Sequence, residues 1–452
     1  MLEILLDKVY GRLFAAQVIA LAGTGLLTVA LGLLAYQVAG ADAGAVLGTA
    51  LAIKMIAYVT IAPVVGALAA RLPRRGFLVA MDAVRAAIAV TLPFVDQVWQ
   101  VYVLIFLLQA ASAGFTPTFQ ATIPDVLPEE SRYTRALSLS RIAYDLENLL
   151  SPALAAVLLG FMSFHWLFVG TVAGFVGSAA LILSVTLPRP GEQPEPDGGL
   201  YAKVTHGVRI YLKTPRLRGL LAINLAVASA GAMVIVNTVV IVRALLNRPD
   251  DDVAVALAVY GGGSMIAALA LPRLLDRLPD RAVMLSAAAG LAVLLVAAGA
   301  IAIGGQGGGI GWPVLLAVWG GLGLFYAAAM TPSGRLLKRS AHSADRPAVF
   351  AAQFALSHAC WLIAYPLAGW LGQGIGIGAT FLVLGGLAAF GAVAAAVAWP
   401  AGDPQVIAHD HPDLPADHPH LAEPGHAGAP GGAHRHAVVI DALHPHWPGM
   451  RP

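Results

Sequence analysis

Charged side chains are scarce in this sequence. Asp, Glu, Lys and Arg make up 12% of its 452 residues, whereas 58% are hydrophobic and the mean hydropathy is +0.76. Soluble domains carry charge at about 25% of their positions, so this composition excludes a soluble globular protein. It is typical of a chain that lies in a lipid bilayer.

Cysteine is almost absent as well. Cys360 is the one cysteine, which excludes an internal disulfide framework and any Cys-x-x-Cys metal site. The sequence shows no recognisable arrangement of nucleophile, base and orienting residue, so we expect no enzymatic activity and no bound cofactor. The net charge of +2 gives no indication of a nucleic-acid partner.

Long apolar runs are abundant instead. A bilayer core of ~30 Å needs about 20 mainly apolar residues per helix. Twelve such runs predict an all-α membrane protein with twelve transmembrane helices in two six-helix bundles. The runs cover residues 12–38, 44–70, 77–95, 98–120, 137–160, 164–187, 217–242, 252–275, 282–304, 311–333, 348–372 and 374–400.

The predicted organisation has four parts. Residues 1–187 form an N-terminal bundle, 188–216 a cytoplasmic linker, 217–400 a C-terminal bundle and 401–452 a polar tail. The linker is rich in proline, glycine and charge, which is typical of a connection between two halves. Its second part, residues 200–213, predicts a short amphipathic helix on the membrane surface.

The lysines and arginines predict how the chain is oriented. If the N-terminus is cytoplasmic, almost all basic residues outside the apolar runs fall on the cytoplasmic side. Only Arg243 and Arg248 fall on the opposite side, and cytoplasmic loops carry the excess of basic residues in membrane proteins. We therefore expect a multi-pass protein of a bacterial inner membrane, monomeric, with both termini in the cytoplasm.

A short basic turn occurs twice in the chain. The first copy reads ARLPRR from Ala70 and the second reads DRLPDR from Asp276, an offset of 206 residues. This offset is close to half of the apolar part, so the pattern indicates two copies of one helical unit. With Gly66 before it, the first copy resembles the signature loop between the second and third helices of the major facilitator superfamily, although Ala70 stands where that family has aspartate.

This resemblance implies the major facilitator fold and a gate near the two turns. Two further charged residues just after the first turn, three positions apart, are expected to belong to the charge network that latches this gate. The gating candidates are Gly66, Arg71, Arg74, Arg75, Asp82, Arg85, Asp276, Arg277 and Arg281.

Charges deep inside the apolar runs are candidates for the transport path, because each costs about 2.5–3.5 kcal/mol on insertion scales. Glu147 lies near the middle of the fifth run and is either a proton or cation site or one partner of a salt bridge to another helix. Arg141 and Asp145 are four residues apart and can pair on one helix face. Lys54, in the second run, either neutralises a carboxylate across the bundle or repels a cation.

A histidine inside the eleventh run adds a fifth candidate. His358 is either a neutral side chain bonded to a nearby carbonyl or a proton relay or transient metal ligand. The stretch from Glu147 to Ala156 also resembles the glycine–proline motif of exporters in the same superfamily, with Ser151 and Ala155 among the small residues in place of glycine. This second resemblance implies export.

The tail is unusually rich in histidine. Imidazole is a ligand that nickel, cobalt, zinc and copper ions all accept, so the tail predicts a divalent metal site, and a low-complexity linker is the alternative. The end of the tail, from Val438 to Trp447, carries apolar residues and is predicted to dock on the rest of the chain. The histidines of the tail are His409, His411, His418, His420, His426, His434, His436, His444 and His446.

Twelve helices, the loops predicted at residues 116–130 and 331–340, and a histidine-rich tail resemble the nickel-resistance exporters of the major facilitator superfamily. The resemblance implies export of nickel or cobalt across the inner membrane by proton antiport, with the tail gathering the ion. Two alternatives remain open. One is an exporter of an organic solute, such as a drug or siderophore, with a regulatory metal-binding tail, and the other is a membrane metal sensor that transports nothing.

Overall fold

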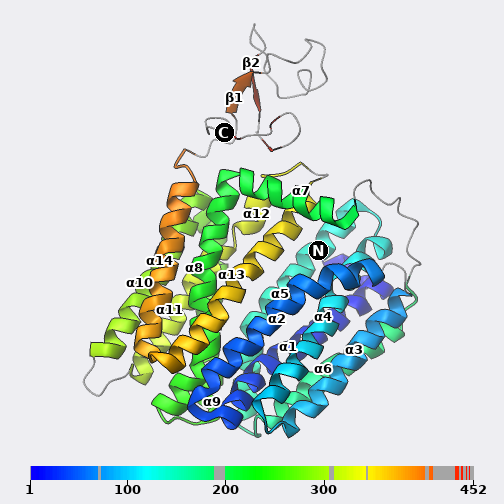
Figure 1. Ribbon diagram of the computed structural model, residues 1–452. Helices are drawn as coiled ribbons and strands as arrows, with labels where there is room; N and C mark the ends of the chain where they lie inside the picture. The colour runs from blue at the N-terminus through cyan, green and yellow to red at the C-terminus, as the bar shows by residue number, and fades with distance from the viewer. Residues whose placement is uncertain are drawn as a thin grey trace.

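Two groups of six long helices make up the body of the molecule in the computed structural model (Figure 1). The helices run roughly parallel, and the first half of the chain lies beside the second. The structure describes residues 2–69, 73–187, 199–304, 310–342 and 345–402 and, in the tail, 407–410, 433–436, 439–440, 444 and 447.

The all-α fold with two six-helix bundles is confirmed. The helices of the first half are α1 (Lys8–Ala39), α2 (Ala43–Ala69), α3 (Arg74–Thr91), α4 (Val98–Val126), α5 (Glu130–Leu159) and α6 (His165–Leu183). Those of the second half are α8 (Pro215–Val239), α9 (Asp250–Leu275), α10 (Asp280–Gly304), α11 (Trp312–Met330), α13 (Arg346–Gly374) and α14 (Ile377–Ala398).

By length and apolar composition, 10 helical stretches among the described residues can cross a membrane. One of them, Lys8–Thr60, contains both α1 and the first part of α2, and α5 is not among the ten. The charged residues that lower the hydropathy of α5, such as Arg141, Asp145 and Glu147, are the ones that made it a candidate for the transport path.

Short elements join the long helices. They are η1 (Leu2–Leu6), η2 (Gly40–Asp42), η3 (Leu92–Phe94), α7 (Gly199–Lys213), the π-helical turn η4 (Val240–Leu245), α12 (Ser333–Lys338) and the strands β1 (Ile407–Asp410) and β2 (Ala433–His436). Helix α7 lies where a surface helix was predicted and crosses one end of the bundle (Figure 1). We call this the α7 end, and the other the far end.

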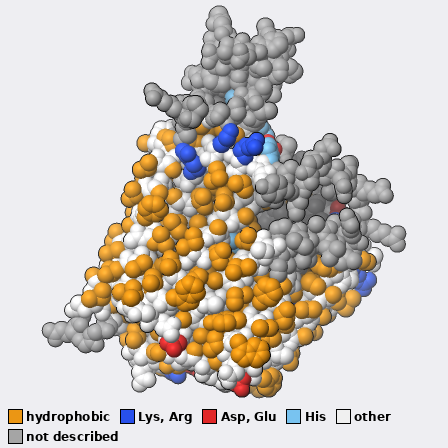
Figure 2. All heavy atoms as spheres, viewed as in Figure 1, with side chains coloured by type: hydrophobic (Ala, Val, Ile, Leu, Met, Phe, Trp, Pro, Cys, Tyr) orange, Lys and Arg blue, Asp and Glu red, His pale blue; other side chains and the backbone are white. Residues whose placement is uncertain are grey.

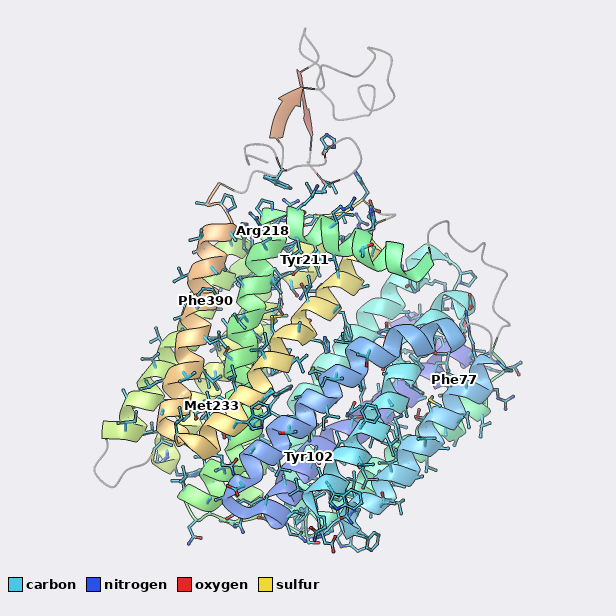
Figure 3. The ribbon with its side chains drawn as sticks, in the orientation of Figure 1. Phe77, Tyr102, Tyr211, Arg218, Met233 and Phe390 are labelled. Atoms are coloured by element: carbon cyan, nitrogen blue, oxygen red, sulfur yellow. The ribbon has the colours of Figure 1, made fainter. Side chains whose placement is uncertain are left out.

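Side chains tie α7 to the second half. Tyr211 lies on α7 (Figure 3), and its hydroxyl donates a hydrogen bond to Gln353 of α13. His206 lies 2.9 Å from the Asp345 carboxylate. Hydrophobic side chains cover the flank of the bundle, while Lys and Arg gather near the tail (Figure 2). This is the distribution expected of a protein whose flank faces lipid.

The loop predicted at residues 116–130 is mostly helical. Helix α4 continues to Val126 and α5 begins at Glu130, so only a short turn separates them. Helix α4 contains Pro117 and Pro124, and proline is tolerated within a membrane helix because neighbouring helices can supply partners for the freed backbone groups. The predicted loop at 331–340 likewise contains α12.

Small residues allow the first and last helices of each half to approach closely. Thr171 of α6 donates a 2.9 Å hydrogen bond to the Gly23 carbonyl of α1, and a Cβ on Gly174 would lie 2.8 Å from the Ile19 carbonyl oxygen. In the second half a Cβ on Gly391 of α14 would lie 2.6 Å from the Ala222 carbonyl oxygen of α8. Backbones approach this closely only where side chains are missing.

The repeated turn makes an equivalent ion pair in each half, with its charges exchanged. Arg74, at the start of α3, pairs with Asp125 near the end of α4. Asp280, which lies 206 positions after Arg74, starts α10 and pairs with Arg335 beyond the end of α11. Arg339 lies 3.9 Å from the same carboxylate. The repeat therefore preserves the pair while its polarity is reversed.

A second arginine of each turn binds the end of the last helix in its half. Arg75 donates a hydrogen bond to the Leu183 carbonyl of α6. Its equivalent Arg281 donates to the Trp399 carbonyl at 2.8 Å and the Ala396 carbonyl at 3.1 Å at the end of α14. The last carbonyls of a helix have no partner within it and carry partial negative charge, so arginine stabilises them.

We predict that exchanging the charges of the second-half pair restores a protein that a single change destabilises. Asp280→Arg faces Arg335 and Arg339 without a carboxylate and should cost on the order of 2 kcal/mol of folding free energy. Adding Arg335→Asp copies the polarity of the first half and should recover most of the loss. Thermal denaturation of the purified variants in detergent measures this, and a double variant less stable than Asp280→Arg would contradict the assigned equivalence.

Candidate functional site

A charged cluster lies deep in the bundle where the two halves meet. Lys54 of α2 interacts electrostatically with Glu147 of α5 and with His358 of α13. Protein surrounds all three side chains closely, and each keeps part of its surface accessible. The structure thus brings together three of the five residues predicted for the transport path.

The cluster lies near the middle of the membrane-spanning length. Lys54 lies eleven residues after the start of α2, and Glu147 lies twelve residues before the end of α5. At 1.5 Å per residue, both are about 17 Å from the far end. A bilayer core of about 30 Å places them well away from water at either surface.

Aromatic side chains border the cluster from both halves. The ring of Tyr58 lies 6.1 Å from that of Phe354 and 5.8 Å from that of His358, between ring centroids. Phe354 and His358 are 3.9 Å apart on α13. Charge and aromatic surface therefore share one site, which suits a solute with both polar and apolar parts.

His358 is held by its own helix. Its Nδ1 lies 2.7 Å from the Phe354 carbonyl oxygen, a distance at which Nδ1 donates a hydrogen bond. A neutral ring with the proton on Nδ1 presents Nε2 as an acceptor. This contact agrees with the carbonyl-bonded histidine that was one of the two interpretations of the sequence.

Glu147 lies where α5 packs on α1. A Cβ on Gly25 of α1 would lie 2.0 Å from the Ser151 hydroxyl oxygen and 3.6 Å from Cγ of Glu147. Ser151 and Ala155 are both buried. The small residues of the predicted exporter motif therefore allow α1 to approach α5, which fixes Glu147 beside it.

The roles predicted for two residues of the transport path, Arg141 and Asp145, stay predictions. The side chains of Arg141 and Asp145 lie outside the described ones, although both residues belong to α5. Their pairing on one helix face is therefore an expectation from spacing alone.

The predicted gating residues fall into separate groups. Arg85 pairs with Asp82, and its guanidinium carbon lies 4.1 Å from the Phe115 ring and 4.5 Å from the Phe175 ring. These rings belong to α4 and α6, so the ion pair is enclosed within the first half. Cation–π contacts of this kind compensate a buried guanidinium for lost water.

The other gating candidates lie at the α7 end. Arg74, Arg75 and Arg281 make the contacts already given, and Asp276 and Arg277 are exposed. Arg71 lies outside the described residues. Gly66 belongs to α2, but its surroundings are not described.

Among the described residues, α2 and α13 bring the two halves into close backbone contact near the far end. A Cβ on Gly48 of α2 would lie 2.5 Å from the Tyr365 carbonyl oxygen of α13. Trp370 of α13 donates a 3.1 Å hydrogen bond to the Thr49 hydroxyl. The two halves are therefore in backbone contact on that side of the cluster.

The two arginines expected at the far end are both neutralised there. Arg243, on the π-helical turn η4, lies 2.8 Å from Asp250 and 5.4 Å from the ring centroid of Tyr36 in the first half. Arg248 lies 2.6 Å from Asp252. Arg243 thus adds a contact between the halves to the glycine interface.

The tail is described only in part. His409 belongs to β1, and His434 and His436 belong to β2. His444 is buried at 5% exposure. The other five predicted ligands, His411, His418, His420, His426 and His446, lie outside the described residues. Among side chains that the structure places, no group of three or more metal-ligating residues comes together.

Sequence comparison decides the family. A sequence profile of the Major Facilitator Superfamily matches residues 13–246 and 221–424, which together cover most of the chain. The chain belongs to the Major Facilitator Superfamily. It is a multi-pass membrane protein of a family of transporters, not of enzymes.

Several curated members of this superfamily are distant relatives. The uncharacterized MFS-type transporter YfiS of Bacillus subtilis (strain 168) is 25% identical over 218 residues, which are 46% of this chain and 51% of YfiS. Macrolide efflux protein A of Streptococcus pyogenes is 23% identical over 218 residues, covering 47% and 53% of the two chains. The same-named protein of Enterococcus faecalis is 24% identical over 189 residues, covering 39% and 58%.

The chain thus spans about half the length of the curated relatives it matches. None of these three is named as a metal exporter, so they give no support to the nickel branch that the tail suggested.

Solved structures of the superfamily share the fold over nearly the whole chain. The nucleoside transporter NupG has a TM-score of 0.68 at 14% identity, covering 87% of this chain and 100% of that one. A POT family transporter in complex with 5-aminolevulinic acid has a TM-score of 0.66 at 10% identity, covering 85% and 94%. Identities this low show the fold alone.

Sequence reasoning missed Tyr58 and Phe354. Tyr58 follows Lys54 by four residues and Phe354 precedes His358 by four, which puts each aromatic ring on the same helix face as the titratable residue. This spacing was a usable signal. The far-end glycine contact had no comparable signal, because the chain contains 49 glycines.

We predict that widening the glycine contact opens the far end of this transporter. Gly48→Val should push α2 from the Tyr365 carbonyl and make an Ala45→Cys reporter, in a Cys360→Ala background, react faster with an impermeant maleimide. Gly262→Val is the matched control, since a Cβ there meets nothing within 4 Å. Equal labelling rates in both variants would show that the Gly48 contact does not close this side.

Proposed function

We propose that this transporter exports an organic solute across a bacterial inner membrane in exchange for protons. The observation that carries the proposal is the Lys54–Glu147 interaction at the centre of the bundle, with His358 of the other half interacting with the same lysine. Titratable groups at this depth are costly and are functional candidates by default.

The chemistry of the site favours an organic solute over a hydrated metal ion. Tyr58 and Phe354 supply aromatic surface next to the charges, and Lys54 repels a divalent cation. Two of the relatives are named macrolide efflux proteins, which supports the organic alternative although each match covers about half of the chains.

Glu147 is the proposed proton carrier. With its carboxylate ionised it attracts Lys54 and leaves the cluster near neutrality, whereas a proton on Glu147 leaves the lysine charge without its partner. Lys54 also interacts with His358 across the interface, so a change on Glu147 alters an interaction between the halves. Two states of such an interface, exchanged by rocking of one half against the other, give alternating access.

The orientation proposed from the sequence assigns the two sides. Lysine and arginine gather at the α7 end (Figure 2), and the excess of basic residues faces the cytoplasm in membrane proteins. We therefore place the α7 end and both termini in the cytoplasm. The far-end contact of Gly48 and Trp370 then closes the outer side, which is the state that accepts solute from the cell.

We predict that Glu147→Gln reduces export to the level of an empty vector while the protein still inserts. The amide keeps the size of the side chain but can neither carry a proton nor attract Lys54. Drug-sensitive cells expressing each variant are scored for efflux of erythromycin and of ethidium, with membrane abundance measured alongside. Glu129→Gln, at the exposed start of α5, is the matched control and should export normally. Full activity in Glu147→Gln would refute the assignment.

Export of nickel or cobalt is the second candidate, and the nine tail histidines are the observation that favours it. Nickel, cobalt and zinc accumulation is compared in cells with the full chain, a chain ending at Pro400 and an empty vector. Lower accumulation of one metal with the full chain, weakened by truncation, would support this candidate. Equal accumulation in all three strains leaves the organic solute as the cargo.

A further inference from the structure

An amide side chain is buried where the two halves meet at the far end. Asn237 lies in the last turn of α8, and 0% of its surface is exposed. The start of α2 and the end of α13 surround its side chain, and these three helices pack on one another (Figure 1). The polar atoms of this side chain therefore need partners inside the protein.

The nitrogen of the amide has such a partner. Nδ2 donates a 3.0 Å hydrogen bond to the Ala368 carbonyl of α13 and lies 3.4 Å from the sulfur of Met233. The opposite orientation of the amide would set two acceptor oxygens against each other. The Ala368 contact therefore determines which end of the amide is nitrogen and which is oxygen.

The oxygen of the amide points at glycine. Oδ1 has almost no accessible surface, and no described residue donates a hydrogen bond to it. A Cβ on Gly44 of α2 would lie 3.1 Å from Oδ1, and a Cβ on Gly372 of α13 would lie 2.9 Å from it. Gly44 belongs to the first half, so the closed far end is what removes this oxygen of the second half from solvent.

A buried acceptor without a donor destabilises the state that buries it. Water would donate to Oδ1, and losing that hydration without replacement typically shifts an equilibrium by roughly 5- to 150-fold. Gly44 is the second residue of α2, and Gly372 lies two residues before the end of α13. The contact is thus at the rim of the far end, and water reaches Oδ1 once α2 moves away.

The amide is not needed to satisfy its own acceptor. Ala368 lies inside α13, where its carbonyl also accepts the hydrogen bond of the helix. The second half alone would therefore keep this carbonyl paired without Asn237. The feature that distinguishes the closed far end is the buried Oδ1.

We propose that Asn237 sets the balance between the closed and the open far end of the transporter. The glycine contact of α2 and α13 stabilises the closed arrangement, and the buried amide oxygen opposes it. The halves can therefore part with a smaller change in free energy than packing alone would require. This inference concerns the opening step, goes beyond the export function and holds whichever solute is carried.

The first test removes the oxygen. Asn237→Ala should slow the reaction of the Ala45→Cys reporter with a maleimide by about 5-fold or more, because closing no longer costs hydration. The reaction is followed in the purified full chain with the Cys360→Ala background. If Asn237 only held α8 to α13, loss of the Nδ2 bond would loosen the far end and speed the reaction, so the sign separates the two roles.

A second asparagine of α8 provides the matched control. Asn224 is also buried, at 2% exposure, and its Nδ2 donates to the Leu220 carbonyl of its own helix. Asn224→Ala removes the same amide from the same helix away from the far-end contact. It should leave the labelling rate of the reporter unchanged.

The second test makes the oxygen more costly to bury. Asn237→Asp keeps the size of the side chain and puts a carboxylate against Gly44, and an ionised group without a partner is more costly to bury than an amide. The reporter should then react faster than in the unmodified protein. General loosening of α8 does not explain opposite shifts from two changes at one position.

An unchanged or faster rate in Asn237→Ala would overturn the proposal, and so would a slower rate in Asn237→Asp. Equal slowing in Asn224→Ala would also overturn it, since the effect would then follow from loss of any buried amide of α8. These measurements use no exported solute, and the Glu147→Gln efflux test does not involve Asn237. The two proposals therefore fail separately.

Discussion

The structure depends on one constraint, which is that a charge within the apolar slab has to be matched by an opposite charge, a carbonyl or an aromatic face. Asp82 and Arg85 meet this demand inside the first half, between two phenylalanine rings. Lys54 and Glu147 meet it at the interface, where each is the other's opposite charge. The first pair is enclosed within one bundle, whereas the second borders the interface between the halves and is the one to which we assign the proton in the proposed export cycle.

The internal repeat shows how the same constraint survives sequence change. Arg74 and Asp280 occupy equivalent positions with opposite charge, and the partner on the next helix has changed sign with them. The outer arginines, Arg75 and Arg281, keep both their identity and their task at a helix end. The two halves therefore share the same contacts at equivalent positions. The residue type is the same in both halves only where the contact requires one particular side chain.

Much of the fold could be predicted from the sequence, because helix length and hydropathy are local properties. Twelve helices, the surface helix α7 and the docked end of the tail lie where periodicity and composition placed them. The loop predicted at residues 116–130 was too long, because α4 continues to Val126 through two prolines that neighbouring helices tolerate. Lys54, Glu147 and His358 could be singled out one by one, but their meeting depends on three helices far apart in the chain. Substrate class was least accessible, since nickel was inferred from a tail that lies outside the bundle.

The glycine contact between α2 and α13 has a mechanical consequence. Where Gly44 and Gly48 face Gly369, backbone meets backbone, and side chains such as Trp370, which donates to Thr49, pack beside this patch. Glycine surfaces can separate and come together again without any change of side-chain rotamer at the glycine positions. The barrier to opening this contact is therefore expected to be low. In the proposed transport cycle the two halves separate at this contact repeatedly, and glycine is the residue type that allows this with the fewest side-chain rearrangements.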